Sequence, residues 1–171
     1  MTTNEKNERP DTAKELDFKL WKLMDTTRYM IFRSRERELA DLGLTPEQAF
    51  TLDILQAGGG SSTINKIVSL TQRQHNSIST LIDRMAKQGM VRKTRSRRDR
   101  RTFRVSLTEK GEGLFARIPR DSIKNAFSCL NTDEKNELTA YLDRVLACVC
   151  VSTGVAYPPS VSGDEDLSTT P

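Results

Sequence analysis

The amino-acid sequence predicts a mainly α-helical α+β fold with one small β-hairpin near the middle of the chain. Apolar residues recur every three or four positions through most of the 171 residues, but between about residues 90 and 107 they alternate with polar ones. The first spacing is typical of helices that bury one face, and the second of half-buried strands. Glycine or proline separates several of the periodic stretches, and the length is typical of one domain that folds without disulfides or metals.

The composition argues against a membrane or secreted protein. Hydrophobic residues make up 36% of the sequence and charged residues 29%, a balance unlike that of membrane proteins. The longest uncharged run, residues 145–163, is apolar only as far as Val151, so we expect no bilayer span. The first ten residues lack the apolar stretch of a secretory signal. Three cysteines without framework spacing favour a reducing, cytoplasmic setting.

The N-terminal part of the chain predicts a disordered lead over residues 1–11 and then two helices. The first begins near Thr12 and meets no proline or glycine before Gly43. A helix of this length must pack on another element to be stable. The second begins at Thr45-Pro46-Glu47-Gln48, which combines a cap, a first-turn proline and a capping box. Its apolar face is expected to contain Phe50, Leu52, Ile54 and Leu55.

Gly58-Gly59-Gly60 ends that helix and has two possible interpretations. A glycine run can bind phosphate, but no Lys-Ser or Lys-Thr pair follows it, and Thr63 stands where the dinucleotide pattern needs a third glycine. A turn is therefore the better interpretation. Ser61, Ser62 or Thr63 can cap a short helix after it, with Ile64, Ile67 and Val68 facing inward.

The next helix is predicted over residues 72–88, with Thr71 as its cap and Gly89 after its end. Its apolar stripe has helical spacing and consists of Ile78, Leu81, Ile82 and Met85. The side chains on the opposite face are short and polar, and none of them is acidic before Asp83. A helix face that is only solvated normally mixes Glu and Lys, so this face is a candidate binding surface.

A strand pair with a basic tip follows. Met90-Val91 begins one extended run, and the alternation of Phe103, Val105 and Leu107 indicates a half-buried second strand. Between Arg92 and Arg104 there are eight basic residues and one acid, Asp99. Such a segment can be a solvated hairpin or linker, but concentrated positive charge also attracts polyanions such as nucleic acid.

The C-terminal part predicts further helices and a tail. Thr108 caps a helix with Glu109 in its first turn, and Pro119 should kink or break it. Asn131 or Thr132 begins the last helix, whose apolar face consists of Leu138, Tyr141, Leu142, Val145, Leu146 and Val149. Residues 152–171 contain three acids and no base, and their composition predicts disorder.

The order of short helix, turn, polar-faced helix and basic hairpin predicts a winged helix-turn-helix over residues 41–107. Side chains near the start of the second helix can reach base edges in a major groove, and hairpin arginines can bind the adjacent backbone or minor groove. In the helix we expect DNA contacts from Gln72, Arg73, His75, Asn76, Ser77, Ser79 and Thr80. In the wing we expect them from Arg95, Arg97, Arg98, Arg100 and Arg101, with Asp99 pairing with Arg101 to stiffen the loop.

The sequence resembles the multiple antibiotic resistance regulator (MarR) family in three successive segments. They are Ser79-Thr80-Leu81-Ile82-Asp83-Arg84-Met85 with Gly89-Met90-Val91, then Asp99-Arg100-Arg101, and then Val105-Ser106-Leu107-Thr108-Glu109-Lys110-Gly111. The resemblance implies a homodimeric winged-helix transcription factor, usually a repressor, on a pseudo-palindromic operator. It also implies release of DNA when a small anionic or phenolic ligand binds between the dimer base and the DNA-binding lobe.

The terminal helices fit a homodimer. Residues 12–40 and 108–151 carry apolar faces at opposite ends of the chain, and a small winged lobe offers them too little partner surface, so a two-fold axis would bury them. Two features depart from the family: Pro119 lies inside its long helix after the wing, and no cysteine stands near the start of the first helix, as in peroxide-sensing members. We expect Cys129, Cys148 and Cys150 to be buried structural thiols, with thiol sensing as the alternative.

The residue types argue against an enzyme or a metalloprotein. The single histidine, His75, lies on the polar-faced helix, and the scattered cysteines give no metal cluster. We therefore expect no catalytic residue, no metal site and no cofactor. The alternative to a DNA-binding regulator is a winged-helix module that binds protein or RNA; such a protein-binding module would bind with weak salt dependence and no preference for operator-like DNA.

Overall fold

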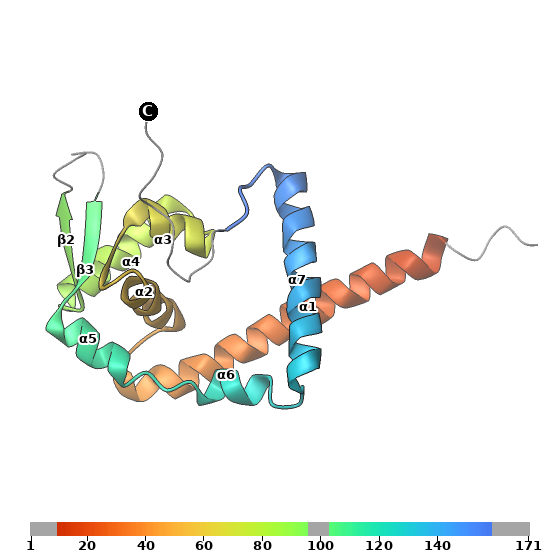
Figure 1. The fold of residues 1–171 in the computed structure, drawn as a ribbon, viewed down its shortest axis with the longest axis horizontal. Helices are drawn as coiled ribbons and strands as arrows, with labels where there is room; N and C mark the ends of the chain where they lie inside the picture. Colours follow the sequence, from red (N-terminus) through yellow and green to blue (C-terminus); the bar gives the residue numbers. More distant parts are fainter. Residues whose placement is uncertain (1–9, 96–102, 159–171) are drawn as a thin grey trace, which may run out of the picture.

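The computed structural model describes residues 10–95 and 103–158 and consists of a winged lobe joined to long helices (Figure 1). The first three helical elements are α1 (Pro10–Leu39), the short 3-10 helix η1 (Ala40–Leu42) and α2 (Pro46–Ala57). The lobe continues with β1 (Ser61–Thr63), α3 (Ile64–Thr71), α4 (His75–Lys87), β2 (Val91–Arg95) and β3 (Phe103–Leu107). The chain then forms α5 (Glu109–Ala116), α6 (Asp121–Ala126) and α7 (Thr132–Thr153). The mainly helical α+β prediction is thereby confirmed.

The hydrophobic core lies inside the lobe, between α2, α3, α4 and the sheet. The predicted stripe of α4 is buried throughout, and Leu52, Ile54 and Leu55 of α2 are buried with it. Leu39, at the end of α1, joins the same cluster, which anchors the long helix to the lobe. Phe50 departs from its prediction, because it is 43% exposed and lies outside this core.

The predicted helix starts of α2 and α7 are confirmed by their capping bonds. Thr45 Oγ1 accepts a hydrogen bond from the Gln48 amide at 3.3 Å, and Gln48 Oε1 accepts one from the Thr45 amide at 2.9 Å. Asn131 and Glu134 form the same reciprocal pair at the start of α7. These bonds satisfy amides that a helix leaves without partners in its first turn.

The sheet has three strands in the order β1-β3-β2, one more than the hairpin that the sequence predicts. β3 lies in the middle and pairs antiparallel with both neighbours, with Val105 opposite Ser62 on one side and Lys93 on the other. Val105 is fully buried. The residues Ser61–Thr63 therefore form a strand, and Thr63 also caps α3 by accepting a hydrogen bond from the Lys66 amide at 3.1 Å.

The prediction for the start of α4 is wrong. Thr71 is the last residue of α3, where its hydroxyl donates to the Ile67 carbonyl at 2.8 Å instead of capping the next helix. Gln72 follows with a left-handed φ of 53°, and α4 begins three residues later at His75, with Gln74 as its N-cap. The turn of the helix-turn-helix is therefore longer than the sequence predicts.

Pro119 breaks the helix after the wing, as predicted. α5 ends at Ala116 and α6 begins at Asp121. Two half-buried side chains of α1 hold the break: the Arg35 guanidinium donates to the Pro119 carbonyl, and the Glu38 carboxylate accepts hydrogen bonds from the amide and hydroxyl of Ser122. Burial alone would raise the pKa of Glu38, but the bonds from Ser122 and Arg35 outweigh it and lower that pKa.

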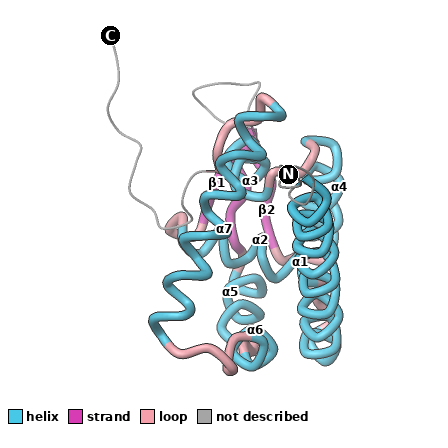
Figure 2. The backbone as a smooth tube through the Cα atoms, turned by 90° about the vertical axis from the view of Figure 1, so that its right-hand side faces the viewer, coloured by secondary structure: helices cyan, strands magenta, loops and turns pink. Residues whose placement is uncertain are grey.

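The helices α1 and α7 stand away from the core. Figure 1 shows that α1 extends far beyond the lobe and that α7 lies to one side of the lobe. In the view of Figure 2, α7 and α1 are well separated. The predicted apolar residues of α7, Tyr141, Leu142, Val145, Leu146 and Val149, are exposed in the single chain, and so are Leu16, Leu20, Leu23 and Met24 of α1. α7 extends to Thr153, two residues into the predicted tail.

The cysteines only partly follow the expectation of buried thiols. Cys150 is buried, but Cys129, in the turn between α6 and α7, and Cys148, on α7, are exposed in the single chain. Within residues 10–95 and 103–158, no helix has the length and hydropathy needed to cross a membrane.

Candidate nucleic-acid interface

The outer face of α4 presents a short row of polar side chains. His75, Asn76, Ser77 and Thr80 are exposed and Ser79 is half-buried, while the opposite face is held in the core by Ile78, Leu81, Ile82 and Met85. The helix has no acid in its first turn. Because one face is fixed in the core, the polar side chains project in a defined direction from the surface of the lobe.

Thr80 and Asn76 are one turn apart on this face. The Thr80 hydroxyl donates to the Asn76 carbonyl at 2.9 Å, so its oxygen remains an acceptor towards the outside. These residues line a surface depression of about 540 Å³ together with Ser77 and Arg84. Arg84 was not among the predicted contacts, although it follows Asn76 and Thr80 at the same four-residue interval.

Gln72 and Arg73 lie in the turn before α4, and Arg73 lines the same depression as Asn76 and Thr80, whereas Gln72 does not. The Gln72 side-chain amide donates to the Ser69 carbonyl at 2.8 Å and to the Ala156 carbonyl at 3.3 Å, so it is directed back onto the protein. Arg73 forms an ion pair with Glu47 of α2 at 3.4 Å. Base contacts from these two side chains remain predictions. To contact a base, Gln72 would first have to break its hydrogen bonds to the Ser69 and Ala156 carbonyls, and Arg73 its ion pair with Glu47.

The base of the wing is tied to α4 by charge. Lys93 of β2 forms an ion pair with Asp83 of α4 at 2.8 Å, and its ammonium also lies 4.7 Å from the centre of the Phe103 ring. Arg95 lies over the same ring at 5.8 Å. These contacts fix the direction in which the hairpin leaves the lobe. The pair between Lys93 and Asp83 is not indicated by any local pattern in the sequence.

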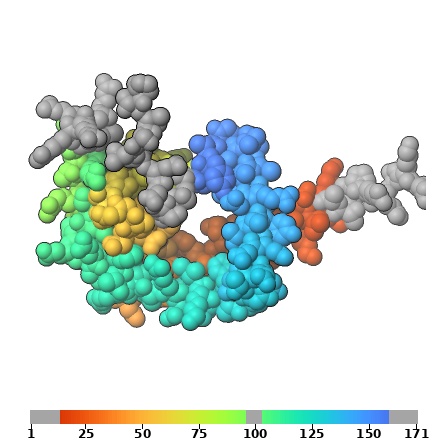
Figure 3. All heavy atoms as spheres, viewed as in Figure 1, coloured from red at the N-terminus to blue at the C-terminus, as the bar shows by residue number. Residues whose placement is uncertain are grey.

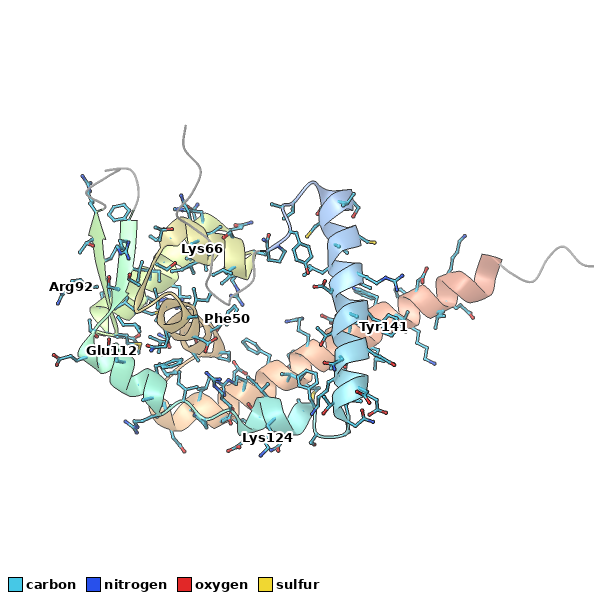
Figure 4. The ribbon with its side chains drawn as sticks, in the orientation of Figure 1. Phe50, Lys66, Arg92, Glu112, Lys124 and Tyr141 are labelled. Carbon is cyan, nitrogen blue, oxygen red and sulfur yellow. The ribbon has the colours of Figure 1, made fainter. Side chains whose placement is uncertain are left out.

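Basic side chains continue along the described part of the wing. Arg92 is exposed at the edge of β2 (Figure 4), and Arg104 donates to the Ser61 hydroxyl at 2.5 Å. The predicted contacts Arg97, Arg98, Arg100 and Arg101, and the predicted pair of Asp99 with Arg101, lie outside the described residues. Their role in binding stays a prediction from the sequence.

A second cavity lies beside this face, between α1, α2 and the helix-turn-helix. It has a volume of about 220 Å³. Its lining combines the apolar side chains of Phe32, Phe50, Ile78 and Leu81 with the charged side chain of Arg73. No described α7 residue lines this cavity; the hollow visible in Figure 3 between the lobe, in gold and green, and α7, in blue, is a separate feature of the surface. Among the described residues no group of three or more His, Cys, Asp or Glu side chains could hold a metal ion.

Comparison with known proteins gives one family. The MarR family model matches residues 42–102, which run from η1 to the wing. The transcriptional regulator PecS of Dickeya dadantii is 26% identical over 145 residues, which are 82% of this chain and 87% of PecS. The transcriptional repressor MdtR of Bacillus subtilis is 26% identical over 107 residues, which are 61% of this chain and 68% of MdtR.

Solved structures share the fold. The regulator RdhR-CbdbA1625, crystallised with 2,4-dichlorophenol, is 25% identical with a TM-score of 0.74, and the match covers 90% of this chain and 92% of that one. A mutant of MarR from E. coli in complex with operator DNA is 21% identical with a TM-score of 0.69, covering 74% and 93%. From the family match, the two relatives and the fold together, the chain is similar in sequence and in structure to helix-turn-helix transcriptional regulators of the MarR family.

Proposed function

We propose that this regulator binds double-stranded DNA in a sequence-specific manner, with α4 in a major groove and the wing on the adjacent backbone. The observation that carries the proposal is the exposed face of α4, where Asn76, Ser77 and Thr80 project beside a basic hairpin without an acid among them. Asn can pair with adenine and Ser or Thr with several bases, whereas the wing arginines neutralise phosphate. The protein acts by binding, not by catalysis.

The active form is a homodimer held together by α1 and the C-terminal helices. Support comes from the exposed aliphatic side chains on α1 and α7, such as Leu20, Leu23, Leu142 and Val145, which a single chain leaves in water at an unfavourable free energy. A two-fold axis would cover both helices and present two α4 helices to successive major grooves about 34–36 Å apart. The operator is then a pseudo-palindrome.

The regulator is a repressor that releases DNA when a small anionic or phenolic effector binds. The cavity between α1, α2 and the helix-turn-helix supports this, because it joins the aromatic rings of Phe32 and Phe50 to the Arg73 guanidinium. An anion there can replace Glu47 as the partner of Arg73 and move the turn before α4. Relatives have related ligands: one structure holds 2,4-dichlorophenol, and BpsR of Bordetella bronchiseptica is regulated by 6-hydroxynicotinic acid.

Titration of DNA affinity against salt tests the proposal. A protein that neutralises several phosphates loses affinity with a log–log slope of about −0.9 per phosphate contact. We expect Arg95→Ala to weaken binding to all duplexes and to make this slope shallower by about 0.9. Lys124→Ala on α6, which removes the same charge far from α4 (Figure 4), should leave the slope unchanged. A module that binds protein would show a weak salt dependence in both variants.

A base-reading role is tested by Asn76→Ala. This change should relax sequence preference by about 1–3 kcal/mol while the salt slope stays the same. Unchanged preference after both Asn76→Ala and Thr80→Ala would contradict the assignment of α4. An RNA-binding module would instead prefer single-stranded or A-form RNA over duplex DNA in the same competition assay.

A further inference from the structure

The ion pair between Glu47 and Arg73 lies between two hollows of the lobe. Glu47 is in the first turn of α2, Arg73 is in the turn before α4, and the two side chains approach to 3.4 Å. Both residues line the depression of about 540 Å³ beside α4 and also the cavity of about 220 Å³ between α1, α2 and the helix-turn-helix. Ile78 and Leu81, which also line both, are buried in the core. The ion pair is therefore the charged part of the wall that separates the two hollows.

Glu47 is an unexpected residue on the side of this wall that faces the depression. The depression is otherwise lined by polar, basic and buried apolar side chains, and among its described residues Glu47 alone is acidic. Asn76 and Thr80, two of the proposed base contacts, line the same depression. A carboxylate beside bound phosphate lowers affinity, because like charges repel across an interface. Its partner Arg73 is the cation that this carboxylate can influence most directly.

The pair is open enough to be exchanged. The Arg73 side chain is 51% exposed and that of Glu47 26% exposed, and a single contact from Nη2 to Oε1 joins them. An ion pair at this degree of exposure contributes little stability. A DNA phosphate offers the same guanidinium a charge-assisted hydrogen bond. Arg73 can therefore contact a duplex, but each such contact first requires the bond to Glu47 to break.

We propose that Glu47 is a positioning residue that holds Arg73 against α2, so that the natural protein binds DNA less tightly than its cationic side chains would allow. The proposal rests on the proposed DNA-binding function. Arg73 is the group that contacts phosphate, and Glu47 acts only through it. The restraint is electrostatic, and loss of the carboxylate charge alone removes it.

Glu47→Gln in the full-length chain tests the proposal, because the amide keeps the size of the side chain and loses its charge. Each protomer that contacts a random-sequence duplex should gain one phosphate contact and make the salt slope steeper by about 0.9. Affinity should rise about tenfold per protomer at ~50 mM salt and about threefold near ~300 mM. If Glu47 only stabilised the start of α2, its neutralisation would not tighten binding. Equal affinities and equal slopes would overturn the proposal.

Asp53→Asn is the matched control. Asp53 lies on the same helix and also pairs with an arginine, Arg120, at 3.1 Å, but it does not line the depression. Its neutralisation removes the same charge and should change affinity by less than about twofold. An equal gain from Asp53→Asn and Glu47→Gln would show a general effect of net charge and overturn the proposal.

The role of Arg73 is tested by combining the changes. In an Arg73→Ala background, Glu47→Gln should leave both affinity and salt slope unchanged, because the cation that it releases is absent. A gain that persists there would show that the carboxylate repels DNA directly, and it would overturn the action through Arg73. Urea denaturation and sedimentation of each variant verify that fold and oligomeric state are the same.

Failure of this proposal is distinguishable from failure of the proposed function. If the natural protein and Glu47→Gln bind the duplex equally well at ~50 mM salt, only the restraint on Arg73 is refuted. If neither binds any duplex under these conditions, the DNA-binding function itself is refuted, and the restraint with it.

Discussion

Replacement of Gly111 by alanine should destabilise the lobe, although glycine is ordinarily a poor residue inside a helix. Gly111 lies in the first turns of α5, at the point where this helix crosses the start of β2. A Cβ atom at this position would lie 2.1 Å from the Met90 carbonyl oxygen and 3.3 Å from a Leu107 methyl group. Met90 immediately precedes β2 and Leu107 ends β3. The Met90 contact is with backbone, so a side-chain rotation cannot relieve it.

The expected magnitude follows from two opposing effects. In an unobstructed helix, alanine is more stable than glycine by about 0.8–1 kcal/mol. Overpacking of a rigid site costs about 1–3 kcal/mol, and a contact of 2.1 Å must open by nearly 1 Å. We therefore expect Gly111→Ala to lower the free energy of unfolding by about 1–3 kcal/mol. Gly113→Ala in the same helix, where a Cβ would contact nothing within 4 Å, should raise it by up to about 1 kcal/mol.

Urea denaturation followed by circular dichroism measures both changes, with the dimer kept at one fixed concentration. The comparison cancels helix propensity, because both changes convert glycine to alanine two residues apart. Equal stability of the two variants would refute the close approach of α5 to β2. The same approach explains why the sequence Leu107-Thr108-Glu109-Lys110-Gly111 ends in glycine, since only glycine fits under the Met90 carbonyl.

Three other perturbations have defined outcomes. Thr108→Ala removes the cap of α5 and the hydroxyl bonds to the Gly89 and Met90 carbonyls, so denaturation should show a loss of about 1–2 kcal/mol; no loss would refute the cap. Glu38→Gln should destabilise the protein at pH 7, and the difference should shrink as the pH falls through the lowered pKa of Glu38, where the natural carboxylate is also protonated; a pH-independent difference would contradict its charged role. Leu142→Arg should convert a dimer to monomer in sedimentation; a stable dimer would exclude α7 from the interface.

Local signals in the sequence predict most helix boundaries of this fold. Thr45 with Gln48 and Asn131 with Glu134 specify their helix starts because each capping box is complete within four residues. The stripe of α4 identifies its buried face because four large apolar side chains recur at helical spacing. Pro119 marks the break between α5 and α6 because it cannot continue the helix.

Boundaries that depend on tertiary contacts are missed. Thr71 looks like an N-cap, but a threonine hydroxyl bonds equally well to the carbonyl four residues earlier, and here it closes α3. Ser61–Thr63 carries no alternation because three polar residues are too few, and it becomes a strand only by pairing with β3. Phe50 and Cys148 are exposed because nothing in residues 10–95 and 103–158 covers the surfaces beside them.

The interface with DNA shows the same division between local and tertiary information. The polar row of α4 is visible in the sequence, since burial of its stripe fixes which residues point outward. The links from Asp83 to Lys93, from Arg73 to Glu47 and from Gln72 to Ala156 join residues 10, 26 and 84 positions apart. The spacing of apolar and polar residues in the sequence does not indicate such contacts. These contacts determine which basic or amide side chains face outward.

A footprint of the purified protein on the DNA that flanks its own gene, at low ionic strength, tests the DNA-binding mode most directly. Two α4 helices related by a dimer axis should protect two half-sites whose centres are about 10–10.5 base pairs apart, and Asn76→Ala should weaken both equally. A single protected half-site, or no protection on any promoter fragment, would contradict a dimer that reads adjacent grooves.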